Sequence, residues 1–579
     1  MKDELKQATN LERPSISAGR GLRLSLPPST FIIHLLVCLL GLFAAFHPTI
    51  LSGFERMQAD PGDTVLNHYI LEHSWQWLTR PDYVGTLWSP PFYYPTTGAL
   101  AYSENLLGVA PLYWLCRLVA PDHLAYQLWM MLVSALTYAS AAAVLRLFGV
   151  RHLLCALGAY WFAFGLPRLV QIGHQQLLGH FFAPPALWCL WTFLSRPRTA
   201  ALAGLAACLF LQLAASFYLG WFLALGLTVF AAMYCWHDRT TFRRVVQYLF
   251  EHRVAAAGVV LTTGILTAAL MAPYFEANRG FRRQMFECLL LLPRWNAWLA
   301  PGPFGPWAAP LKSLSHGLVS EQYLFLGFTF LGLTAVTAAA LAWRRSALGP
   351  ARRRLAIVCL AAAAVLVVIS LRGSGNFTAW SLICKVVPGS RAIRVGARIA
   401  GVVYLLAITG GLVALEGWLR RWRQPSWITA GVAALFACGI AEQVAVRLPS
   451  FDKTEFASKV ERIERSLASG SPAYVEIEPS PNPIAIIEQQ LAAMWAGLRA
   501  NAPVVNGYSG RYPTNYPDCL RPMTLGELSD WLTRNGKGNV AIVTMHRRRG
   551  PLDARLVHST TDASSWPSSP TKPGAATGN

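Results

Sequence analysis

Residues 60–104 read DPGDTVLNHYILEHSWQWLTRPDYVGTLWSPPFYYPTTGALAYSE and lie between two apolar segments. They gather carboxylates, histidines and aromatic rings in a chain whose other long stretches are mostly apolar. Loops of this length in compact proteins tend to carry function. We therefore expect an apolar helical body, with its functional site in this polar loop at the edge of that body.

The composition identifies the class of protein. Hydrophobic residues make up 54% of the 579 residues and charged residues only 14%, whereas soluble domains contain about 25% charged residues. The mean hydropathy is +0.36. These values exclude an ordinary soluble protein and predict a polytopic α-helical membrane protein.

The formal net charge of +21 does not indicate nucleic acid binding. The basic residues form short clusters between apolar runs rather than one basic face. Such clusters orient membrane helices, because cytoplasmic loops carry the excess of Lys and Arg. We expect membrane lipids as partners and no nucleic acid.

Hydropathy predicts about eleven spans, since roughly 20 apolar residues cross the hydrocarbon core. They lie near residues 29–50, 124–146, 153–169, 182–195, 199–215, 219–236, 254–273, 323–342, 355–371, 397–416 and 427–446. With a cytoplasmic N-terminus, alternation puts the arginine clusters near 146–151, 196–198, 239–244, 344–354 and 420–423 on one side. The first span lacks a small-residue cleavage site, so we do not interpret it as a removed signal peptide.

The apolar segment Leu106 to Ala120 is short and contains Pro111 and Arg117. Counting it as a full span would invert every later loop and move the arginine clusters outside. We therefore assign it to an interfacial or half-inserted helix.

The predicted domains are a cytoplasmic segment (1–28), a transmembrane domain (29–447) with a large first outer loop (52–123), an extracytoplasmic α/β domain (448–558) and a disordered tail (559–579). The α/β domain follows from helix-like and strand-like segments that alternate after the last span. The tail is rich in Ser, Pro, Thr and Gly.

Asp63 follows the first span closely, with Asp60 nearby. A carboxylate at the low-dielectric edge of a membrane can act as a general base or orient a hydroxyl. Asp is also a favoured N-cap, so Asp63 could instead cap a helix that begins at Thr64. Glu104 likewise either binds an acceptor hydroxyl or a divalent cation, or is an acid in the first turn of a helix.

The segment RLVQIGHQQLLGH, from Arg168 to His180, is a polar break between two predicted spans. His174 and His180 are six positions apart, which does not match the spacing of a helical metal pair. Polar groups at membrane depth are costly and often functional. We expect Arg168 and His174 to form a hydrogen-bonding pocket wall, with a solvated interfacial turn as the alternative.

Arg391, Arg394 and Arg398 open a span on the side where positive charge is otherwise sparse. Guanidinium groups in that position need a partner, and a phosphate is a natural one. Anchoring to lipid head groups is the alternative. In the last domain, Tyr508 follows an Asn-Gly pair and could stack on a sugar, although a structural turn explains the same residues.

The 11 cysteines contain no CxxC or CxxH pair. The sequence therefore indicates neither a zinc site nor a disulfide framework. We predict no cofactor, and a divalent cation is possible but not indicated.

Several segments together resemble the GT-C superfamily of integral-membrane glycosyltransferases, particularly the bacterial YfhO-like and protein-mannosyltransferase-like group. They are GDTVLNHYILEH, FYYPTTGALAYSENLLG, IGHQQLLGH, EQYLFLG, IRVGARIA and VVNGYSGRYP. The resemblance implies a hexosyltransferase of the bacterial inner membrane, with a cytoplasmic N-terminus and an extracytoplasmic C-terminal domain. It would move a sugar from a polyprenyl-phosphate donor to a lipid or glycan acceptor.

By this resemblance Asp63 matches the catalytic acidic position, and Arg394 or Arg398 would lie near the carrier phosphate. Many members have a second acid beside the first, whereas Gly62 stands there in this chain. The alternative function is a non-catalytic transporter or flippase of a lipid-linked saccharide. Transporters often contain inverted repeats; we find no clear repeat, which favours an enzyme.

Overall fold

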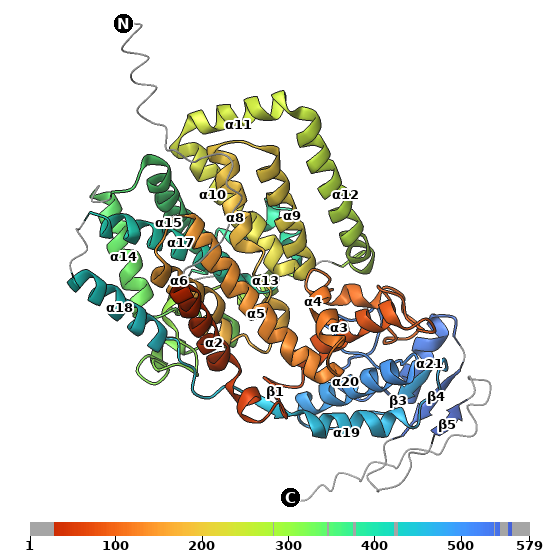
Figure 1. Cartoon of the computed structure of the whole chain (residues 1–579). Coiled ribbons are helices and arrows are strands. Elements are labelled where there is room, and N and C mark those ends of the chain that lie inside the picture. Colours follow the sequence, from red (N-terminus) through yellow and green to blue (C-terminus); the bar gives the residue numbers. More distant parts are fainter. Residues whose placement is uncertain are drawn as a thin grey trace, which may run out of the picture.

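The structure is a computed structural model that describes residues 28–557, except 282, 344–346, 374–377, 422–425, 538 and 545–553. A bundle of helices forms most of the molecule, and a smaller part with the strands lies at one end of it (Figure 1). The cytoplasmic segment predicted before residue 28 and the predicted disordered tail lie outside the described residues.

The bundle follows the apolar segments of the sequence. Its helices are α2 (Pro28–Leu51), α5 (Asp122–Leu147), α6 (His152–Phe164), α7 (Leu166–Leu169), α8 (Ala183–Ser195), α9 (Thr199–Ala215), α10 (Phe217–His237), α12 (Arg253–Ala277), α14 (Phe328–Ala342), α15 (Pro350–Ser370), α17 (Ala400–Leu419) and α18 (Ser426–Ala441). Six helical segments of the described chain are long and apolar enough to cross a membrane, by length and composition. The protein is thus a multi-pass membrane protein, and the count of eleven spans remains a prediction.

Two helices mark the extremes of burial in the bundle. In the most apolar window of the segment Gly396–Leu419, which contains α17, 94% of the residues are buried, whereas in α12 the share is 11%. Since α17 carries almost no polar side chains, it forms the centre of the core. Helix α12 stands at the edge of the bundle and turns most of its surface outward (Figure 1).

One end of the bundle is closed by α11 (Arg239–Glu251), which lies across the helix ends between α10 and α12 (Figure 1). Asp238 starts this helix, because its side chain accepts a hydrogen bond from the Thr240 backbone N–H. We predicted only a basic loop here. The helix is amphipathic instead. This end, which we call the α11 end, carries Arg239, Arg243 and Arg244 of α11 and also Arg354, which pairs with Asp238.

The opposite end, which we call the domain end, holds the short elements of the loops. They are α3 (Asp63–Thr79), η1 (Ala99–Tyr102), α4 (Ala110–Arg117), η2 (Gln175–Leu177), α13 (Met285–Leu290), η3 (Trp295–Leu299), η4 (Lys312–Ser315), η5 (Ser320–Gln322), α16 (Trp380–Val386), η7 (Ser390–Ala392) and η8 (Gly396–Ile399).

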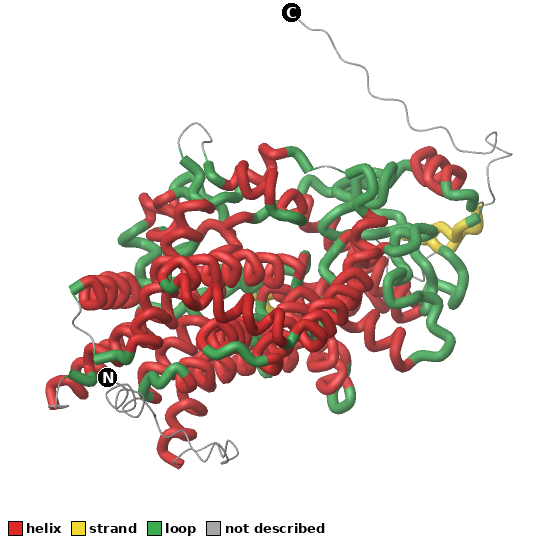
Figure 2. Tube along the Cα trace, turned by 90° about the horizontal axis from the view of Figure 1, so that it is seen from above, coloured by secondary structure: helices red, strands yellow, loops and turns green. Residues whose placement is uncertain are grey.

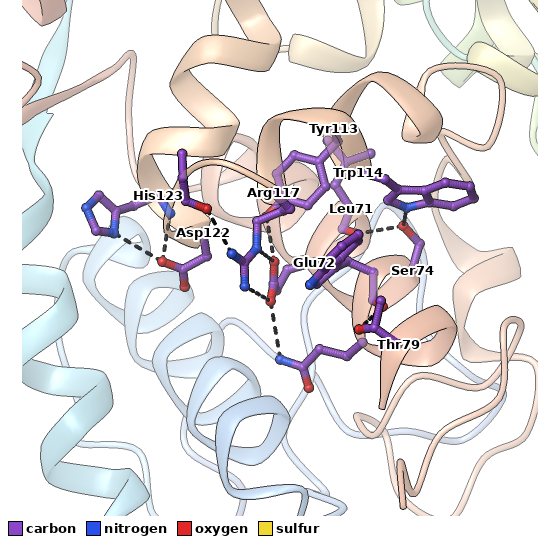
Figure 3. Close-up of polar contacts among 12 residues, drawn as sticks. Leu71, Glu72, Ser74, Thr79, Tyr113, Trp114, Arg117, Asp122 and His123 are labelled. Atoms are coloured by element: carbon purple, nitrogen blue, oxygen red, sulfur yellow. Dashed lines mark hydrogen bonds and ion pairs between the residues drawn. The ribbon is translucent and has the colours of Figure 1, made fainter. Parts of the chain in front are cut away.

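Helix α4 has eight residues, which are too few to span a bilayer. This length fits the assignment of Leu106 to Ala120 to an interfacial or half-inserted helix. A buried ion pair holds it against α3 (Figure 3). Arg117 donates to Glu72 at 2.8 Å, and the Tyr113 hydroxyl donates to the same carboxylate at 2.6 Å. Because Glu72 is only 3% exposed, loss of either donor would leave a buried charge poorly compensated.

The C-terminal segment folds at the domain end. It contains β2 (Ser450–Asp452), α19 (Lys453–Glu464), β3 (Ala473–Val475), α20 (Pro483–Ala500), α21 (Leu525–Arg534), β4 (Val540–Val543) and β5 (Ala554–Val557). In the sheet β3–β4–β5, β3 and β4 are parallel and β4 and β5 antiparallel. The strands lie at one edge of an otherwise helical molecule (Figure 2).

This segment packs directly on the first loop. Strand β2 pairs antiparallel with β1 (Arg56–Gln58), which follows α2. The Trp495 indole donates to the backbone oxygen of Val65 at 3.3 Å, and Arg499 pairs with Asp122 at 3.1 Å. The first loop and the C-terminal segment therefore form one layer over the bundle.

Candidate functional site

Asp63 is the first residue of α3, and its carboxylate meets the loop between α7 and η2. Its Oδ2 lies 2.7 Å from Nδ1 of His174. Gly62 holds the N-cap position and Asp63 makes no side-chain cap, so the N-cap interpretation of Asp63 is wrong. With 29% of its side chain exposed, the carboxylate remains open to a ligand.

Amide side chains hold this loop against α3. Asn67 donates to the side-chain oxygen of Gln176 at 2.7 Å, and Gln175 donates to the Thr64 hydroxyl at 2.7 Å. Both bonds lie within one helical turn of Asp63. They fix His174 relative to the carboxylate, which a flexible turn would not do.

A second carboxylate lies on the other side of the imidazole. Nε2 of His174 is 3.6 Å from Oε1 of Glu321, which belongs to η5. Burial alone would lower the pKa of His174, but the hydrogen bonds to Asp63 and Glu321 raise it to about 9. His174 is therefore an imidazolium at neutral pH.

The pKa of Asp63 shifts in the opposite direction. Burial raises it, but the hydrogen bond and charge of His174, together with the charge of Arg398, outweigh burial and hold it below its ordinary value. The hydrogen bond from His174 also lowers the pKa of Glu321 to about 2. The site thus contains two carboxylates and one imidazolium.

Arg398 and Arg168 border one cavity behind this pair. The cavity has an enclosed volume of about 50 Å³, and His180, Gln171 and Tyr404 also line it. Arg398 is 8% exposed, and its guanidinium lies 4.6 Å from the centre of the Tyr218 ring. Nε of Arg398 and both Nε and Nη1 of Arg168 are buried without a hydrogen-bond partner.

A buried donor left unpaired is costly, so the unpartnered guanidinium N–H groups of this cavity favour an anion as a ligand. Among the residues that the structure describes, the Arg168 side chain donates to the backbone oxygens of Leu177 and Leu178, both through Nη2. The cavity therefore has the chemistry of an anion site with an apolar wall formed by Leu324, Leu326 and Leu219.

The other two arginines of the predicted phosphate cluster lie elsewhere. Arg391 and Arg394 are both exposed, and Arg391 donates to the backbone oxygen of Cys384. They belong to η7 and the turn after it, whereas Arg398 lies in η8, which enters the bundle. Of the three, the structure brings only Arg398 to the cavity.

Glu104 caps a helix, but not the one expected. No helix begins directly after it, since α4 starts at Ala110. Its Oε1 instead accepts from the Ser216 hydroxyl at 3.1 Å, and its Oε2 accepts from the Phe217 backbone N–H at 2.7 Å. Glu104 therefore caps α10 across space. Burial raises its pKa, although these hydrogen bonds and the charge of Arg398 oppose the shift.

Tyr508 comes to the site from the C-terminal segment. Burial and then the charges of Asp63 and Asp60 raise the pKa of its hydroxyl, and its side chain interacts with the Asp63 carboxylate. Asp63, His174, Arg398 and Tyr508 thus come from four separate parts of the chain to one region.

Sequence reasoning missed Glu321, Gln176 and Tyr218 as site residues. Glu321 is the first letter of the segment EQYLFLG, but an acid next to a predicted span has no distinctive spacing. Tyr218 lies in the first turn of α10. No pattern in the sequence shows that its ring covers the Arg398 guanidinium.

No metal-holding group of three or more His, Cys, Asp or Glu side chains occurs among the residues that the structure describes. His174 uses its two ring nitrogens for two different carboxylates. The prediction of a site without a cofactor remains a prediction.

The fold and site together define a helical multi-pass membrane protein with an acid–imidazole–acid cluster and an anion cavity at one end. The model of a family described as a domain of unknown function, DUF6311, matches residues 35–444. This is more than half of the chain, and the protein belongs to that family. No curated protein matches the sequence.

Solved structures that match the chain do so at low sequence identity. The archaeal oligosaccharyltransferase AglB from Archaeoglobus fulgidus, in complex with an inhibitory peptide and a dolichol-phosphate, is 10% identical, with 89% of this chain and 69% of that chain covered and a TM-score of 0.47. ArnT from Cupriavidus metallidurans in the apo state is 13% identical, with 89% and 93% covered and a TM-score of 0.34.

Proposed function

We propose that this protein is a membrane glycosyltransferase that moves a sugar from a polyprenyl-phosphate donor to an acceptor hydroxyl at the domain end. The observation that supports it is one juxtaposition. An ionised, partly exposed carboxylate, Asp63, lies in the electrostatic field of Arg398, whose unpartnered N–H faces an anion cavity. A transfer reaction that releases a phosphate needs both groups.

In this proposal the cavity holds the donor phosphate. Arg168 and Arg398 donate charge-assisted hydrogen bonds to it, which are stronger than neutral ones. The leucines of the cavity wall contact the first isoprene units of the carrier. Because the guanidinium groups are already in place, they stabilise the phosphate as its negative charge develops, without reorganisation.

Asp63 acts on the acceptor. Its carboxylate accepts a hydrogen bond from the acceptor hydroxyl and directs the oxygen towards the anomeric carbon. The new carbon–oxygen bond forms as the bond to the phosphate oxygen breaks, the electron pair leaves with the phosphate, and the hydroxyl proton passes to Asp63. A carboxylate with a lowered pKa is a weak base, so proton transfer comes late and the departing phosphate provides most of the driving force.

The test uses purified full-length protein with a labelled polyprenyl-phosphate hexose and a membrane-extracted acceptor. Asp63→Asn should reduce release of the carrier at least about 100-fold, the lower range for loss of a general base. Asp60→Asn is the matched control, since Asp60 accepts a hydrogen bond from the Gly62 backbone N–H, whereas His174 bonds to Asp63. Unchanged release by Asp63→Asn, with normal protein levels, would remove Asp63 from the reaction.

A further inference from the structure

A second cluster with the charge to bind an anion lies at the domain end, apart from the Arg168 and Arg398 cavity. Two guanidinium groups approach the same ring there: Arg511 lies 3.6 Å and Arg283 lies 5.7 Å from the centre of Phe281. Arg511 also donates to the backbone oxygen of Ala277, the last residue of α12.

The charges of this pair are only partly compensated. Arg283 pairs with Glu287 at 2.8 Å, but its Nε is buried without a hydrogen-bond partner. Arg511 donates to Asn278 and Ala277, which are neutral groups. Two close guanidinium groups, of which Arg283 pairs with a carboxylate and Arg511 bonds to neutral groups, have the charge to bind an added phosphate.

An apolar groove leads away from these arginines between α9 and α12. Its volume is about 560 Å³, and its lining includes Leu205, Leu209, Gly264, Met271 and Phe275. Phe275 is 75% exposed and lies in the last turn of α12, next to Ala277 and Asn278, which Arg511 contacts. This end of the groove therefore lies close, along α12, to the residues that Arg511 contacts.

The same loop connects this pair to the carboxylate site. Tyr508, whose side chain interacts with Asp63, is three residues before Arg511, and three residues span at most about 10 Å. Tyr102 lies beside this loop, with its ring 6.0 Å from the Arg511 guanidinium. A phosphate at Arg511 would thus lie within the length of a short glycan from Asp63.

From these contacts we infer that the acceptor is a phosphate-linked lipid glycan. Its chain occupies the α9–α12 groove, its phosphate binds Arg283 and Arg511, and its sugar passes Tyr102 to reach Asp63. The inference rests on the proposed function for the role of the bound lipid as acceptor. The binding site itself is defined by the groove and the two arginines.

Glycines of α12 provide a matched pair of variants. A Cβ atom added at Gly264 or at Gly258 would meet nothing within 4 Å, so either position has open space for a larger side chain. Only Gly264 lines the groove. Gly264→Phe fills the groove, and Gly258→Phe places the same bulk on the same helix outside it.

The experiment counts polyprenyl monophosphate bound per full-length protein in phosphatidylcholine nanodiscs, by native mass spectrometry. Wild type and Gly258→Phe should bind two, and Gly264→Phe or the double variant Arg283→Gln/Arg511→Gln should bind one. The double variant Arg168→Gln/Arg398→Gln should lose the lipid that binds in the Arg168 and Arg398 cavity. Thermal unfolding of each variant verifies the fold.

The outcomes separate the two proposals. One bound lipid that only Arg168→Gln/Arg398→Gln removes would overturn the second site and leave the proposed function standing. One bound lipid that only Arg283→Gln/Arg511→Gln removes would overturn the phosphate cavity and leave the second site. Equal binding by Gly264→Phe and Gly258→Phe, or displacement of the second lipid by equimolar phosphatidylglycerol, would also overturn the inference.

Discussion

His174 holds its charge because two carboxylates face its two ring nitrogens. Its pKa rises from 6.5 to about 9 on folding. The stabilisation is therefore complete below pH 6.5 and is lost as the pH rises through about 9. We expect the melting temperature of the wild type to exceed that of His174→Gln by a few degrees at pH 6, with the gap closing above pH 9.

Differential scanning fluorimetry of the detergent-solubilised protein measures this gap across the pH range. His316→Gln serves as the control, since His316 is an exposed histidine of the same outer loop as Glu321. A gap between wild type and His174→Gln that stays constant from pH 6 to 9.5 would contradict the charged state of His174.

Arg398 and Arg394 provide a direct test of which arginine binds the carrier phosphate. Arg398 is 8% exposed and lines the cavity, whereas Arg394 is exposed. We expect Arg398→Gln to lower kcat/KM for the donor about 100-fold, the effect of removing one donor to a developing anion. Arg394→Gln should change it less than threefold. Equal losses of kcat/KM in the two variants would instead place the carrier phosphate outside the cavity, near Arg394.

At the scale of single residues, the sequence identified candidate site residues but not the residues that they contact. Asp63 and His174 were both singled out, because polar groups beside apolar spans are conspicuous. Their contact depends on how the loop after α7 folds back on α3 through Asn67 and Gln176. Long-range hydrogen bonds between amide side chains have no local signature in a sequence.

Glu104 caps a helix that belongs to a distant segment of the chain. It accepts hydrogen bonds from Ser216 and Phe217 at the start of α10. Glu104→Gln keeps an acceptor oxygen and should preserve stability and most activity. Glu104→Ala removes the cap and should cost about 1 kcal/mol, the typical loss of a capping side chain.

Urea unfolding followed by far-ultraviolet circular dichroism, with transfer activity on the same samples, distinguishes the two roles of Glu104. Ser216→Ala is a useful companion, since it removes one of the two bonds and leaves the carboxylate. A stable Glu104→Gln protein without activity would show that the charge itself binds substrate.

The elements that hydropathy predicted best are the long apolar helices. The spans near 124–146 and 254–273 match α5 and α12 closely. The span near 153–169 is divided instead, because α6 ends at Phe164 and the next turn contains Pro167. Helix α11 was not predicted, because its three arginines were interpreted as part of a basic loop. Its apolar residues nevertheless recur at helical spacing.

On the scale of the whole molecule, the site lies where four distant parts of the chain meet. The first loop supplies Asp63, the loop after α7 supplies His174, η8 supplies Arg398, and the C-terminal segment supplies Tyr508. Composition and charge predicted the membrane body. They could not predict that the C-terminal segment packs on the first loop through Trp495 and Arg499, since these contacts join residues far apart in sequence.

The sidedness of the molecule is the last prediction. Arginines concentrate at the α11 end, and cytoplasmic loops carry the excess of positive charge, so we expect the site and the C-terminal segment outside. Gln247→Cys in α11 and Ser458→Cys in α19 are both exposed positions, introduced after Cys438, an exposed native cysteine, is replaced by Ala. An impermeant maleimide should label Ser458→Cys in intact spheroplasts and Gln247→Cys only after permeabilisation. The reverse pattern would place the Asp63 site in the cytoplasm, where a nucleotide-linked donor could reach it, and would contradict the need for a polyprenyl-phosphate donor.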